Sequence, residues 1–223
     1  MAQPHTAPRV AVVGIVISFI LAVGVAGLRS FNADPVERVA EAAGTIAFAT
    51  VFAAPALLAL LGVRGRPSLL LAAGALDMVL AFLALFSFIG LVFVIPAVLF
   101  FVAAGRTRSD ATSPFRSAAA VAVAVVLGTA GFFALFAHEN PICWARNPAT
   151  GQSYRLDADR FVQGSTISMD SRDLPAGATE SGCSSDSISI SEAIAAIAVV
   201  ASMLGATWLV SKPPRMEPVL IAG

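Results

Sequence analysis

Long apolar runs separated by short polar links make up most of the chain. The clearest runs occupy residues 10–29, 42–63, 117–137 and 191–211. A helix of about 20 residues spans the roughly 30 Å hydrocarbon core of a bilayer, and it satisfies its own backbone hydrogen bonds there. Each of the four runs is therefore predicted to form a transmembrane helix.

A further apolar stretch, 68–105, is too long for a single span. It contains one charged side chain, Asp77. As one helix it would be about 57 Å long at 1.5 Å per residue, well beyond the hydrocarbon core. We therefore expect two spans, 68–86 and 89–105, joined by a turn at 86–90. The sequence thus predicts an all-α polytopic membrane protein with six transmembrane helices, five of them within residues 1–137.

The first run, 10–29, has an alternative interpretation as a signal peptide, since the small residues Ala26 and Gly27 lie near its end. Its apolar part is longer than the roughly 7–15 residues of a signal-peptide core, and few basic residues precede it. We expect a retained helix.

Helix-start signals and internal prolines refine these boundaries. Residues 34–37 (Asp-Pro-Val-Glu) and 189–192 (Ser-Ile-Ser-Glu) match capping boxes, and 113–114 (Ser-Pro) places proline at a first helical position. Pro55 and Pro96 lie inside predicted spans. Each lacks an amide and so frees a backbone carbonyl, which a membrane helix tolerates.

Composition supports a membrane protein and excludes other classes. Apolar residues make up 57% of the chain and charged residues 13%, against roughly 45–50% and ~25% in soluble domains. That is too little charge to cover a soluble surface. The 14 basic and 14 acidic side chains cancel, which excludes a strongly basic nucleic-acid-binding protein.

Basic residues separate into two sets of links, and this predicts the orientation. One set holds eight basic residues, whereas the opposite link holds only Arg29 and Arg38. Short cytoplasmic links are enriched in Lys and Arg. We expect a cell-membrane protein with both termini in the cytoplasm, including the tail 212–223, and with segment 138–190 outside. The eight residues are Arg9, Arg64, Arg66, Arg106, Arg108, Arg116, Lys212 and Arg215.

Segment 138–190 is polar and holds both cysteines of the chain, Cys143 and Cys183. Two cysteines in one extracytoplasmic segment predict a disulfide. Closing a loop of about 40 residues contributes roughly 4 kcal/mol in the chain-entropy model. Turn residues Gln163-Gly164 predict a β-hairpin. The β-prone runs are 153–156, 160–163 and 165–169.

Asp77 is the sharpest candidate for a functional residue. An ionised aspartate at the centre of a span costs about 2.5–3.5 kcal/mol, so it should meet water or a partner. One interpretation is a carboxylate in a transport path for protons or cations. The other is a protonated carboxyl that hydrogen-bonds across a helix interface. The candidate partners are Thr45, Thr50, Thr129 and Ser202.

The sequence gives little support for a metal, haem or retinal site. His138 and Glu139 stand at the outer end of run 117–137, where we expect an interfacial helix cap; a divalent metal or proton-entry role is the alternative. With no histidine or lysine inside a span, bis-histidine haem and a retinal Schiff base are excluded. We therefore expect no cofactor and no metal.

Enzyme activity is not expected either. The chain has no nucleotide-binding glycine loop, zinc-protease motif or serine-hydrolase motif. An aspartyl protease needs two carboxylates that share a proton, and only one lies within the predicted spans.

Small residues recur on three predicted helices at a spacing that lets helices approach closely. They predict packing within the bundle or onto another subunit. The expected function is an interaction or accessory membrane protein, bound to other subunits or to itself in the bilayer. A small transporter or channel using Asp77 is the alternative. We call each set of recurring small residues a stripe. The three stripes are Gly14, Ser18, Ala22, Ala26; Ala120, Ala124, Gly128; and Ala198, Ser202, Ala206.

Overall fold

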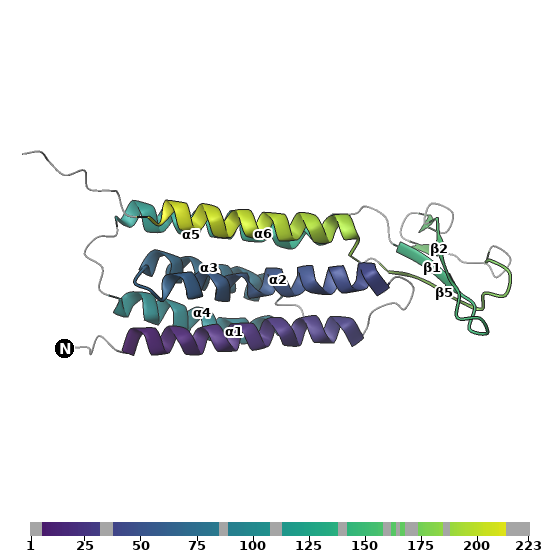
Figure 1. Cartoon of the computed structure of the whole chain (residues 1–223), viewed down its shortest axis with the longest axis horizontal. Helices are drawn as coiled ribbons and strands as arrows, with labels where there is room; N and C mark the ends of the chain where they lie inside the picture. Colours follow the sequence, from purple (N-terminus) through teal and green to yellow (C-terminus); the bar gives the residue numbers. More distant parts are fainter. Residues whose placement is uncertain are drawn as a thin grey trace, which may run out of the picture. The chain divides into compact units, whose positions relative to one another are not determined.

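A computed structural model describes most of the chain, and its described part is mostly helical (Figure 1). The predicted helix start at 34–37 and the pair His138 and Glu139 lie outside the described residues. These are 6–31, 38–84, 89–107, 113–137, 142–157, 162–163, 166–167, 174–184 and 188–212. The helices are α1 (Thr6–Phe31), α2 (Arg38–Gly62), α3 (Pro67–Leu83), α4 (Ile89–Arg106), α5 (Pro114–Ala134) and α6 (Ile190–Val210).

Each predicted span coincides with a helix, but the helices differ in length. Four contain stretches long and apolar enough to cross a membrane, in α1, α2, α5 and α6. Helices α3 and α4 are shorter, and α3 has 17 residues, the lower limit for a span. It ends at Leu83 rather than at 86. The mostly helical fold is thus confirmed, while six spans stay a prediction.

Several helices begin at the capping residues or prolines that the sequence predicted. The Ser189 amide donates to Glu192 Oε2 at 2.8 Å, and the Glu192 amide donates to Ser189 Oγ at 3.3 Å. This reciprocal pair is a capping box, and it satisfies two amides that the first turn of α6 would otherwise leave unpaired. Pro114 is the first residue of α5 and Pro67 the first of α3, where a missing amide costs nothing.

The polar segment contains a small antiparallel sheet. Strands β1 (Ile142–Arg146), β2 (Ser153–Leu156) and β5 (Glu180–Ser184) follow the order β2-β1-β5. A separate pair joins β3 (Val162–Gln163) to β4 (Thr166–Ile167). The predicted strand 153–156 and the pairing of the predicted hairpin are confirmed. Gln163, predicted in the turn, instead ends β3 and pairs with Thr166, and Gly164 lies outside the described residues. Strands β1 and β5 were not predicted.

The chain divides into two compact units. The first unit comprises residues 1–21, 52–129 and 199–223, and the second comprises 22–51 and 130–198. The first holds α3 and α4 entire, and the second holds the sheet.

Small residues allow close helix contacts in the first unit. A methyl group added at Gly14 of α1 would lie 2.7 Å from the Phe100 ring of α4. One added at Gly128 of α5 would overlap the Leu76 side chain of α3 and lie 3.3 Å from the Met203 sulfur of α6. The predicted stripes on α1 and α5 therefore serve internal packing.

Candidate functional site

Asp77 lies ten residues into α3, and its side chain is fully buried, with 0% of its surface exposed. Both carboxyl oxygens are inaccessible, and within the described part of the chain neither has a hydrogen-bond partner. A buried polar group without a partner is costly, so this position requires an explanation.

The predicted hydrogen bonds from Asp77 to nearby hydroxyl groups are not formed. The Thr50 hydroxyl donates instead to the Ile46 carbonyl of its own helix at 2.7 Å. Ser202 lies on the exposed side of α6, which directs it away from a buried group. Thr45 and Thr129 also make no hydrogen bond with Asp77 in the described structure. No hydrogen bond between Asp77 and these hydroxyls is therefore present among the described residues, and the interpretation of Asp77 as a cross-helix link stays a prediction.

Helix register places Asp77 at the depth of Pro55 in α2. A methyl group added at Gly62 would lie 3.1 Å from both the Leu69 Cβ and the Leu70 Cγ, so the end of α2 packs against the start of α3. Asp77 follows Leu70 by two helical turns on the same face, and Pro55 precedes Gly62 by the same interval. Both residues are therefore about 10 Å along their helices from this contact.

A second register places Asp77 near Pro96 in α4. Helices α3 and α4 pack along their length in antiparallel directions: Gly90 lies against Ala81, and Ala97 lies against Gly74. Asp77 falls between these two contacts. Asp77 lies three residues after Gly74, and in the antiparallel α4 the matching position lies three residues before Ala97. Asp77 is therefore level with Val94, two residues from Pro96.

An aromatic contact supports both registers independently. The rings of Phe52 in α2 and Phe93 in α4 lie 5.4 Å apart. Each ring precedes a buried proline by three residues, Pro55 and Pro96 respectively. The two prolines and Asp77 therefore occupy one depth of the first unit, on three adjacent helices.

The basic residues at one end of the first unit tie three helices together. The Arg66 guanidinium stacks 3.5 Å from the centre of the Trp208 ring and donates to Ser211 Oγ at 3.4 Å. Arg116 donates to the Lys212 carbonyl at 3.2 Å. The beginnings of α3 and α5 thus meet the end of α6, where cations also offset the helix dipole.

The stripe on α6 differs from the stripes on α1 and α5. Ala198 and Ser202 are exposed and Ala206 is half-buried, so most of this stripe does not pack internally. Ala201 and Gly205 are exposed beside it, and a methyl group added at Gly205 would meet nothing within 4 Å. We define the outer α6 face by Ala198, Ala201, Ser202 and Gly205.

The predicted disulfide is present in the second unit. Cys143 and Cys183 face each other directly in the antiparallel pairing of β1 with β5, with Cα atoms 4.0 Å apart. Beside them Trp144 covers Gly182, because a methyl group added there would lie 3.2 Å from the indole ring. The bond therefore joins two neighbouring strands that are far apart in the sequence.

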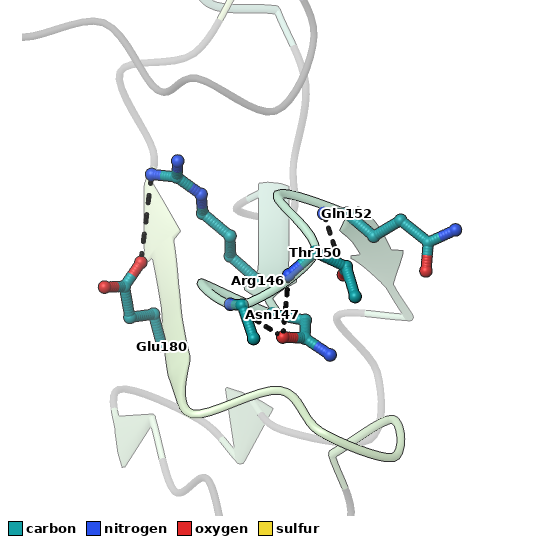
Figure 2. Close-up of polar contacts among 6 residues, drawn as sticks. Arg146, Asn147, Thr150, Gln152 and Glu180 are labelled. Atoms are coloured by element: carbon teal, nitrogen blue, oxygen red, sulfur yellow. Dashed lines mark hydrogen bonds and ion pairs between the residues drawn. The ribbon is translucent and has the colours of Figure 1, made fainter.

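The polar residues of the sheet chiefly stabilise a turn (Figure 2). Asn147 Oδ1 accepts hydrogen bonds from the Ala149 and Thr150 amides at 3.0 and 3.3 Å, which closes the loop between β1 and β2. Arg146 and Glu180 form an exposed ion pair at 3.9 Å, worth little in water. Among the described residues, no group of three or more potential metal ligands is present.

Comparison with known proteins gives no relative from which a function could be transferred: no family model, no curated protein and no solved structure matches the chain.

Proposed function

We propose that the chain crosses the cell membrane six times, with both termini in the cytoplasm and segment 138–190 outside. The gathering of Arg66, Arg116 and Lys212 at one end of the first unit supports this orientation, because cytoplasmic ends collect basic residues. The Cys143–Cys183 disulfide supports an external location for its segment.

We further propose that the protein is an accessory or interaction subunit that binds other membrane proteins or copies of itself. The outer α6 face carries this proposal. Lipid chains gain nothing from meeting small side chains, whereas another helix packs closely on them. In this same chain, the equivalent stripes on α1 and α5 are covered by neighbouring helices.

A matched pair of glycine substitutions tests the interaction role. Gly205 and Gly24 are both exposed on apolar helices, and an added methyl group meets nothing within 4 Å at either. Gly205→Leu should abolish a complex of fixed stoichiometry, measured by native mass spectrometry from a mild detergent, while Gly24→Leu preserves it. A wild-type protein that is monomeric in mild detergent would contradict the proposal.

Asp77 supports a second candidate, a small proton- or cation-coupled transporter or channel. Its burial without a hydrogen-bond partner among the described residues is the observation that favours it, since intramembrane carboxylates commonly mark transport paths. In proteoliposomes, Asp77→Asn should abolish pH- or ion-driven flux without changing the fold. Absence of flux in the wild-type protein would remove this candidate.

A further inference from the structure

We propose that Asp77 is a proton-binding site, in which the protonated carboxyl donates a hydrogen bond to the main-chain carbonyl of Val92, which Pro96 leaves without its amide. The inference concerns this carboxyl alone and is independent of the outer α6 face.

The acceptor follows from helix chemistry. In an α-helix the amide of each residue donates to the carbonyl four residues earlier. Proline has no amide hydrogen. Pro96 therefore cannot serve the Val92 carbonyl in α4, and this carbonyl lacks its regular donor.

The carboxyl and the Val92 carbonyl lie in the same region of the first unit. Three separate contacts set their depth: Gly62 on Leu70, Ala97 on Gly74, and Phe52 on Phe93. Pro96 and Asp77 are buried. A carboxylate has no hydrogen to donate to a carbonyl, whereas the protonated acid has one. Proton uptake by Asp77 therefore supplies a donor for the Val92 carbonyl.

No described charge is placed to neutralise an ionised Asp77 instead. On every surrounding helix the charged groups lie near the ends, and each is more than about 13 Å along its own helix from the residue level with Asp77. In the described side chains these are Arg9 on α1, Glu41 on α2, Arg64 and Arg66 between α2 and α3, Arg106 on α4, Arg116 on α5, and Glu192 and Lys212 at the two ends of α6.

Binding is a simple protonation. The Asp77 carboxylate takes up one proton from water and becomes a neutral acid, and deprotonation returns that proton to water. No oxidant, metal or second carboxyl group takes part. The neutral acid keeps one oxygen as an acceptor and uses its hydroxyl as the donor to the main-chain carbonyl.

A double-mutant cycle tests the hydrogen bond. Asp77→Leu should raise the unfolding equilibrium constant of the wild-type protein in mixed micelles roughly threefold, the effect of an average intramembrane hydrogen bond. In a Pro96→Ala background, where the restored amide can donate to the Val92 carbonyl, the effect of Asp77→Leu should disappear. Pro114→Ala is the matched control, because Pro114 begins α5 and deprives no helical carbonyl of its donor.

Infrared spectroscopy of the folded protein, with isotope-labelled aspartate, tests the proton without requiring a stable leucine variant. We expect the carbonyl band of one protonated aspartic acid at neutral pH, absent in Asp77→Asn. Three results would overturn the proposal: no such band in the wild-type protein, an undiminished Asp77→Leu effect in the Pro96→Ala background, or a stability that depends on Na⁺ through Asp77 at constant ionic strength. A failure here would leave the Gly205 test of subunit binding unaffected.

Discussion

At the scale of single residues, the buried positions decide how the helices meet. Asp77 could be identified from the sequence because it is the single charge in a long apolar stretch. Its neighbours could not be, because α3 is apolar on all sides and its pattern does not show which face meets which helix. Hydroxyl groups at suitable depth, such as Thr50 and Ser202, bond to their own helix or lie on the exposed side.

Gly128 provides a test of the packing at this scale. Gly128→Val should destabilise the protein by about 1–3 kcal/mol, because the new side chain would overlap Leu76. Gly24→Val is the control, since it makes the same change on an exposed helix surface with nothing within 4 Å. Unfolding in mixed micelles measures both variants. Equal stability of the two variants would show that α5 does not pack on α3 as described.

At the scale of elements, helices with local start signals were predicted best. The capping box at 189–192 is formed as expected, because both partners lie within one turn. Strand β5 was missed because its sequence, Glu-Ser-Gly-Cys-Ser, has little intrinsic strand preference. It becomes a strand through pairing with β1 and the Cys143–Cys183 bond, which are tertiary effects that local pattern does not reveal.

The capping box yields a prediction with an internal control. Glu192→Ala should cost about 1 kcal/mol of stability, since it leaves the Ser189 amide without its acceptor. Glu192→Gln keeps an acceptor oxygen at the same position and should cost much less. Hydrogen exchange at the first turn of α6 would report the difference. Similar protection in all three proteins would contradict a capping role.

The stability of the three-stranded sheet depends on its disulfide. Replacing both Cys143 and Cys183 with alanine should destabilise the sheet by up to about 4 kcal/mol, because the unfolded segment is no longer closed into a loop. Limited proteolysis between residues 142 and 184 should become fast. Intact mass should rise by two hydrogens when the wild-type protein is reduced, and two thiols already reactive without reductant would refute the bond.

At the scale of the whole molecule, hydropathy located all six helices within a few residues. This is because about 20 consecutive apolar residues have few alternatives to a membrane helix. Whether the shorter α3 and α4 each cross the bilayer depends on the lipid around them, which neither sequence pattern nor helix length determines. The six-span topology is the claim on which the interaction and transport proposals both depend.

Labelling of single cysteines in intact cells tests that topology most directly. In a background with Cys143 and Cys183 replaced by alanine, single variants carry Ser87→Cys in the predicted turn between the third and fourth spans, Ser113→Cys, and Thr150→Cys. A membrane-impermeant thiol reagent should label Ser87→Cys and Thr150→Cys from outside, and should label Ser113→Cys only after the cells are permeabilised. Labelling of Ser113→Cys in intact cells, or no labelling of Ser87→Cys from outside, would contradict the six-span arrangement with cytoplasmic termini.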